Sequence, residues 1–167
     1  MTEINVLFRK SAEEYGEKYR DHYLEIYKIY LKMADKISER RQSANSFFLT
    51  INTAIVGLVS YLQIGQTEKA GSIFYLVIGV AGMIICYSWY RLILSYKHIN
   101  SGKFKVLHLI EQNLPLAPYD TEWEMLGRGE DSKKYLPFTH IEIFVPWVFF
   151  GLHAFVFLYG LSALIKK

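Results

Sequence analysis

Residues 44–64 read ANSFFLTINTAIVGLVSYLQI and contain no charged side chain. Two more apolar runs follow, at residues 73–94 and 141–165, and each holds a single charged residue. A helix needs about 20 such residues to cross a hydrocarbon core about 30 Å thick. The sequence therefore predicts an all-α integral membrane protein with three transmembrane helices.

Composition excludes several other classes of protein. The chain has 167 residues, of which 51% are hydrophobic and 16% aromatic, too many for a disordered chain. The net charge of +3 is small, so no nucleic-acid partner is expected. Cys86 is the only cysteine, which rules out a disulfide within the chain. The first 40 residues lack the apolar stretch of a cleaved signal peptide, so the first run is expected to remain as an anchor.

The distribution of basic residues predicts the orientation. Residues 1–43 hold nine Lys and Arg and residues 91–140 hold seven, whereas only Lys69, Lys166 and Lys167 lie elsewhere. By the positive-inside rule the N-terminus and the long loop are expected to be cytoplasmic and the C-terminus external. The short interval at residues 65–72 is expected to be a turn that joins the first two spans. This gives a cytoplasmic amphipathic helix (1–43), a transmembrane hairpin (44–95), a helical cytoplasmic loop (96–140) and a third transmembrane helix with a short external tail (141–167).

A long helix is predicted from Ser11 to Gln42, running directly into the first span. Apolar and tyrosine side chains recur in it at spacings of 4, 3, 4, 3 and 4, which is typical of a packing seam. Such a seam packs either on the loop of its own subunit or on another copy, and the sequence favours neither. Its residues are Tyr19, Tyr23, Ile26, Tyr30, Met33 and Ile37.

The long loop has helical parts of its own. An amphipathic helix is predicted at residues 103–112, before a Pro-rich break. Residues 121–124 match the capping-box pattern for the start of a second helix, which Gly127 would close. A second capping box, at residues 139–142, would open the third span.

Small and hydroxyl side chains form a stripe along the first span, at spacings of 4, 3, 4 and 3. Such stripes usually serve close helix packing. The alternative is that repeated copies of the stripe line a hydrated path across the membrane. The residues are Ser46, Thr50, Thr53, Gly57 and Ser60, with Asn45 and Asn52 beside them.

His153 lies near the middle of the third span. An ionisable side chain at that depth is costly, so it is a candidate for a pH-sensitive site. A neutral, hydrogen-bonded histidine is the simpler interpretation, and Thr50, Asn52 and Thr53 lie at a suitable depth to be its partners. Gly79 and Gly82 in the second span indicate close helix packing.

No catalytic or cofactor-binding motif is present, and no cofactor is expected. His108 and Glu111 lie one helical turn apart and could share a metal ion, but such pairs are common by chance. No catalytic residue and no metal site is therefore predicted.

Several stretches resemble the RipA family of small bacterial inner-membrane proteins. The resemblance includes residues 37–41, 45–52 and 99–104, then Glu111, and covers most of the chain. Its other matching positions are Leu114-Pro115, Pro118-Tyr119, Glu122-Trp123, Tyr135-Leu136-Pro137 and Glu142. The resemblance implies a homo-octamer in the bacterial plasma membrane with a role in intracellular growth, and it supplies no reaction or ligand.

Three functions are compatible with these observations. The leading hypothesis is a non-enzymatic oligomeric assembly with a pore-like architecture, in contact with membrane lipids, that acts in stress or envelope adaptation. The second is a membrane pore effector in antiphage defence. The third is a lipid-acting enzyme that uses His98, His108 or His140, although no nucleophile or carboxylate pair supports it. A protein partner other than the chain itself is not identified by the sequence.

Overall fold

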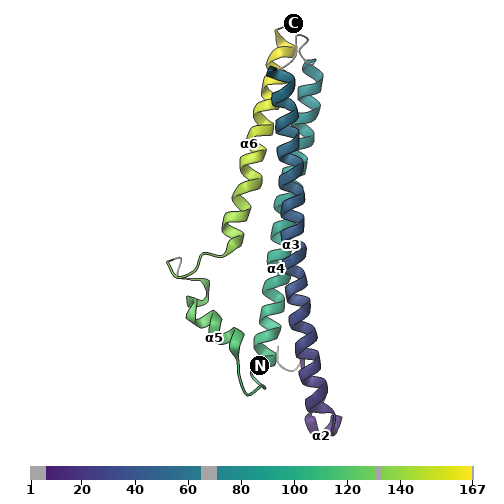
Figure 1. The fold of residues 1–167 in the computed structure, drawn as a ribbon, viewed down its shortest axis with the longest axis vertical. Helices are drawn as coiled ribbons and strands as arrows, with labels where there is room; N and C mark the ends of the chain where they lie inside the picture. The colour runs from purple at the N-terminus through teal and green to yellow at the C-terminus, as the bar shows by residue number, and fades with distance from the viewer. Residues whose placement is uncertain (1–6, 65–70, 131–132, 167) are drawn as a thin grey trace. The chain divides into compact units, whose positions relative to one another are not determined.

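The computed structural model describes residues 7–64, 71–130 and 133–166, and all the regular elements in them are helices (Figure 1). In these residues the α-helices with both ends described are α2 (Ala12–Tyr15), α3 (Tyr19–Ile64), α4 (Ser72–Glu111), α5 (Pro118–Met125) and α6 (Phe138–Ile165). One short 3₁₀ turn, η1 (Gly127–Gly129), follows α5.

Three of these helices are long and apolar enough to cross a membrane: α3, α4 and α6. The predicted fold class, an all-α chain with three transmembrane helices, is confirmed. The predicted turn between the first two spans lies largely outside the described residues, since these resume at Gly71.

The long N-terminal helix begins later than the sequence predicted. Gly16 has a φ of +86°, which ends α2, and α3 then starts at Tyr19 rather than Ser11. Ser11 instead caps α2, because its hydroxyl accepts a hydrogen bond from the Glu14 amide at 3.2 Å. From Tyr19 onward α3 runs for 46 residues without a break.

The prediction of a separate helix at residues 103–112 is wrong. These residues are the C-terminal part of α4, which runs for 40 residues from the second span to Glu111. Nothing between the span and residue 103 breaks the helix, and the apolar face of Phe104, Leu107 and Ile110 gives its last turns a surface to pack on.

Both predicted capping boxes are also wrong. Helix α5 begins at Pro118, and the Thr121 hydroxyl donates backward to the Ala117 carbonyl at 2.7 Å. Helix α6 begins at Phe138 with Pro137 at its N-cap, so Thr139 already lies inside the helix. Gly127 does lie just beyond the end of α5, with a φ of +67°.

The chain divides into two compact units. The α5 unit comprises Met1–Glu39 and His98–Leu136, and the three-helix unit comprises Arg40–Lys97 and Pro137–Lys167. In the α5 unit, the first turns of α3 pack on the last turns of α4 around Tyr27, Ala34, Leu107 and Ile110.

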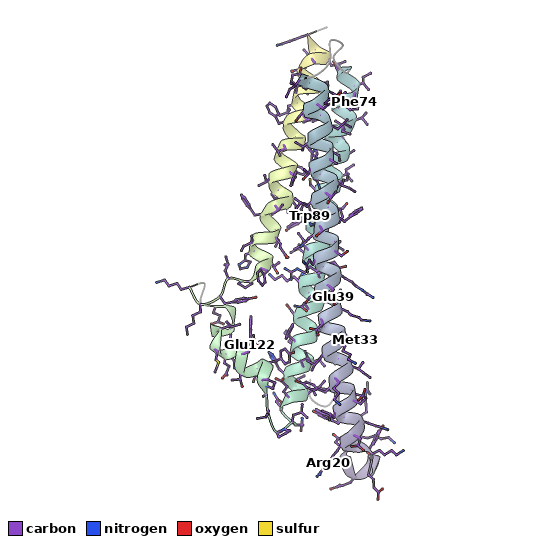
Figure 2. The ribbon with its side chains drawn as sticks, viewed as in Figure 1. Arg20, Met33, Glu39, Phe74, Trp89 and Glu122 are labelled. Carbon is purple, nitrogen blue, oxygen red and sulfur yellow. The ribbon has the colours of Figure 1, made fainter. Side chains whose placement is uncertain are left out.

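The three-helix unit contains the apolar parts of α3, α4 and α6, which lie side by side (Figure 1). Trp89 of α4 is buried in it and stacks on Phe48 of α3, with ring centroids 5.8 Å apart (Figure 2). The same indole ring contacts Phe149 of α6 at 6.4 Å. One aromatic side chain thus joins all three helices.

Candidate functional site

The stripe of small and hydroxyl residues lies on the outer surface of the three-helix unit. All five of its members are exposed: Ser46, Thr50, Thr53, Gly57 and Ser60. The Thr50 hydroxyl donates to the Ser46 carbonyl and the Ser60 hydroxyl to the Val56 carbonyl, both at 2.8 Å. These bonds leave the lone pairs of both hydroxyl oxygens facing outward, available to water or to a neighbouring helix.

Asn52 does not belong to this stripe. Its side chain is 0% exposed and points toward the other two helices. The Asn52 carbonyl oxygen lies 2.9 Å from Nε2 of His153, on α6, and accepts a hydrogen bond from the Cys86 thiol, on α4, at 3.1 Å. The amide nitrogen donates to the Phe48 carbonyl at 2.8 Å. One asparagine side chain therefore links all three spans.

The hydrogen bonds of Asn52 determine the form of His153. Because the amide nitrogen already donates to Phe48, the oxygen faces the imidazole and can only accept. Neutral His153 must therefore carry its proton on Nε2. Depth in the span had suggested Thr50, Asn52 and Thr53 as partners, and of these the structure brings only Asn52 to the histidine.

Glycines bring α4 and α6 into close contact around this network. A methyl group on Gly82 would lie 2.3 Å from the His153 ring, and one on Gly79 would lie 2.8 Å from Cβ of Phe157. On the other helix, a methyl group on Gly160 would lie 2.8 Å from Cβ of Tyr75. These positions are small because the facing helix occupies the space of a side chain. The sequence indicated this for Gly79 and Gly82, and the structure adds Gly160.

A second polar cluster lies at one end of the three-helix unit. The Arg41 guanidinium of α3 forms an ion pair with Glu142 of α6 and donates to the Thr139 hydroxyl at 3.1 Å. The other Glu142 oxygen accepts from the Asn45 amide at 3.0 Å, and the Asn45 oxygen accepts from the Trp89 indole at 2.8 Å. The capping-box interpretation missed this cluster because it assigned Glu142 to its own helix terminus.

The predicted seam of α3 divides between two faces of the helix. Tyr23 and Tyr30 pack on α4 of the same chain: the Tyr23 hydroxyl donates to the Ile110 carbonyl, and the Lys103 ammonium lies 4.4 Å from the centre of the Tyr30 ring. Ile26 and Met33 are exposed, and Tyr19 and Ile37 are half-buried. The six residues therefore do not form one continuous packing surface within the α5 unit.

Glu111 is the buried carboxylate of the α5 unit, with 1% of its surface exposed. Its oxygens accept hydrogen bonds from the Tyr27 hydroxyl at 2.8 Å and from the Tyr119 and Asp120 amides at 3.2 and 3.0 Å. The amides belong to the first turn of α5, so Glu111 caps that helix from another element. Burial, followed by the hydrogen bond to Glu111, raises the pKa of Tyr27 above its ordinary value.

Protein groups already engage both His108 and Glu111, the pair that the sequence placed one helical turn apart. Both carboxylate oxygens of Glu111 are engaged by protein donors, and Nδ1 of His108 faces Asp120 at 3.6 Å. Within residues 7–64, 71–130 and 133–166, no three His, Cys, Asp or Glu side chains are grouped so that they could hold a metal ion. His98 and His140, the other histidines considered for a lipid-acting enzyme, are exposed.

The comparisons with known proteins agree with the three-span architecture. The model of the octameric membrane protein family (8xMP) matches residues 24–162, which include the first two spans, the whole of α5 and all but the last three residues of α6. No curated protein and no solved structure matches the chain. The family match confirms the resemblance to small octameric membrane proteins that the sequence indicated. The chain belongs to the octameric membrane protein family, and each of its three long helices contains a segment long and apolar enough to cross the membrane.

Proposed function

We propose that eight copies of this chain form a pore-like ring in a bacterial inner membrane, with the hydroxyl stripe of α3 facing a hydrated lumen. The observation that carries the proposal is the exposure of all five stripe residues on the three-helix unit. In a membrane oligomer such a face meets lipid, another subunit or water. Lipid is the least favourable of the three for hydroxyl groups with unused lone pairs.

The chemistry of the stripe indicates a weakly selective path. Its side chains are hydroxyl groups and a glycine, with no carboxylate and no cation. Ion selectivity in helical pores usually requires a ring of charges or of aligned carbonyl groups. The assembly is therefore proposed to be a non-enzymatic scaffold or wide pore with a role in envelope or stress adaptation. The resemblance to the RipA family adds a proposed role in intracellular growth.

The proposed orientation places the α5 unit and the N-terminus in the cytoplasm. It rests on sixteen Lys and Arg in residues 1–43 and 91–140, against three elsewhere. The charges of the Arg41–Glu142 cluster then lie at the cytoplasmic surface, where water and lipid headgroups stabilise them.

Thiol accessibility in membranes tests the lumen directly. Thr50→Cys and Thr53→Cys should react with a charged, membrane-impermeant methanethiosulfonate reagent, because the reaction requires water at the sulfur atom. Phe47→Cys and Leu58→Cys are matched controls, since both side chains are exposed on the same helix but on its apolar side. These controls should not react.

Unreactive cysteines at positions 50 and 53 in an intact octamer would contradict the hydrated lumen and assign the stripe to packing between subunits. A functional measurement complements this test. Thr50→Leu with Thr53→Leu should reduce the release of a small dye from liposomes, because leucine side chains would dewet the path.

A further inference from the structure

The α5 unit has an apolar face on α3 that nothing in the described chain covers. Ile26, Ile29 and Met33 follow each other at spacings of 3 and 4, so they share one side of the helix. They are 58%, 49% and 46% exposed. Their neighbours Tyr27, Tyr30 and Ala34 are turned by about 100° and pack on α4. We call the three exposed residues the α3 strip.

The α3 strip is not covered by the hydrocarbon core of the membrane. Residues 25–36 include Glu25, Lys28, Lys32, Asp35 and Lys36. A segment with five charged side chains in twelve residues is strongly disfavoured in a hydrocarbon core, so this part of α3 lies outside it. Contiguous apolar surface in water marks a site of association.

The α3 strip continues into a hollow with a volume of about 300 Å³. Ile26 belongs to both, and the walls of the hollow also include the rings of Phe8, Tyr15 and Tyr19. Arg9 and Lys10 line the same hollow, and neither forms an ion pair with any residue that the structure describes. The hollow at the end of the strip is therefore apolar with a positive border.

A complementary surface lies on α5 of the same unit. Met125 is 75% exposed, and Glu122, one helical turn before it, is also exposed. Leu116, just before the helix, is 76% exposed. This surface is apolar with a negative border. In Figure 2, Glu122 and Met33 lie on opposite sides of the last turns of α4.

We infer that α5 of one subunit docks on the α3 strip and hollow of the next subunit. The occupant is a second copy of this chain, because the family is octameric and a closed ring requires each subunit to offer two different, complementary surfaces. The α5 unit supplies such a pair, apolar with a positive border on one side and apolar with a negative border on the other. The inference rests on family membership and on the proposed ring, and not on the proposed lumen.

Photocrosslinking of the full chain in membranes tests this contact. p-Benzoylphenylalanine replaces Ile29, an exposed position where the larger side chain has room, and a matched variant carries it at Lys28, one residue away on a different side of the helix. Octamers are assembled from a mixture of ¹⁴N- and ¹⁵N-labelled chains, and the crosslinked peptides are identified by mass spectrometry. Mixed-isotope peptides then report contacts between copies.

Position 29 should yield mixed-isotope crosslinks to residues 116–125, and position 28 should yield none above background. Crosslinks from position 29 to lipid, to a different protein, to another part of the chain, or only within one copy would overturn the inference. Equal crosslinking of residues 116–125 from positions 28 and 29 would also overturn it.

A charge variant gives a second measurement. Ile29→Glu with Met33→Glu should lower the fraction of octamer in native mass spectrometry, while Leu24→Glu with Gln42→Glu, which adds the same two charges on another side of α3, should leave it unchanged. An intact octamer in the first variant, or equal loss in both, contradicts the contact. The thiol-accessibility test uses variants at positions 50 and 53, which leave the α3 strip and α5 unchanged. A failure of the docking contact can therefore be distinguished from a failure of the proposed lumen.

Discussion

His153 is held by a single acceptor that it shares with a thiol. Asn52 on α3, Cys86 and Gly82 on α4 surround the ring, and none of them is charged. A protonated ring would therefore have no carboxylate partner among the described residues. The geometry favours a structural hydrogen bond over a pH sensor, although the sequence allowed both.

His153→Leu is expected to destabilise the protein by about 1–3 kcal/mol, because it leaves the buried Asn52 oxygen with only a weak thiol donor. Thermal unfolding in detergent measures this. The loss should be the same at about pH 5.5 and 7.5. A loss confined to the lower pH would instead support the pH-sensitive site. Cys86→Ala serves as the comparison and should cost less, since a thiol is a weaker donor.

Tyr27 is expected to make the α5 unit less stable at alkaline pH. Burial raises its pKa in the folded chain, and the hydrogen bond to Glu111 raises it further, whereas the unfolded value is about 10. Between these two values the unfolded chain loses the proton first. The stabilisation is therefore complete below about pH 10 and falls as the pH rises above it.

Tyr27→Phe should reduce this alkaline loss and cost about 1–3 kcal/mol at neutral pH, because Glu111 loses a buried donor. Circular-dichroism melts at about pH 8 and 10.5 compare the two proteins. Part of the pH dependence should remain in the variant, because burial also raises the pKa of Tyr23. An unchanged slope in Tyr27→Phe would contradict this assignment.

At the scale of elements, the Arg41–Glu142 pair joins α3 to α6. The two side chains are only 15% and 27% exposed, so water screens their attraction poorly. Arg41→Gln and Glu142→Gln should each destabilise the protein by about 1.5–3 kcal/mol, the range for hydrogen bonds to charged groups. The double variant should cost less than the sum of the two.

Another Arg–Glu pair provides the control for this measurement. Arg128 and Glu124 form an ion pair at 2.6 Å, with both side chains 59% exposed. Exposed pairs contribute little, so Arg128→Gln should change stability by less than about 1 kcal/mol. Equal effects at Arg41 and Arg128 would contradict a special role for the pair between the two spans.

At the scale of the whole molecule, the basic residues predict the topology. Alkaline phosphatase fused after Lys167 should be active, because that end is expected outside the cytoplasm, and a fusion at Asp131 should be silent. A cytoplasmic reporter such as green fluorescent protein should give the reverse pattern. If phosphatase is active only at position 131, the orientation of all three spans is inverted.

The spans could be predicted from sequence because the length of an apolar run is a local property. The polar contacts could not, since they depend on neighbours about a hundred residues away. Glu142 matches a capping pattern, but the approach of Arg41 decides its role. Asn52 and Thr53 are adjacent in sequence, yet one is buried and the other exposed, because successive residues of a helix point about 100° apart.

The contact between Gly82 and His153 also restricts which pairs of residues the chain can carry there. The imidazole occupies the volume that a side chain on residue 82 would need, so the two positions share one volume. A methyl group at position 82 therefore requires a smaller residue at position 153. A smaller residue there would lose the hydrogen bond that His153 forms with Asn52. Gly82→Ala should therefore be more damaging in the natural chain than in one that already carries His153→Ala. A larger residue at position 82 is therefore expected only together with a smaller one at position 153.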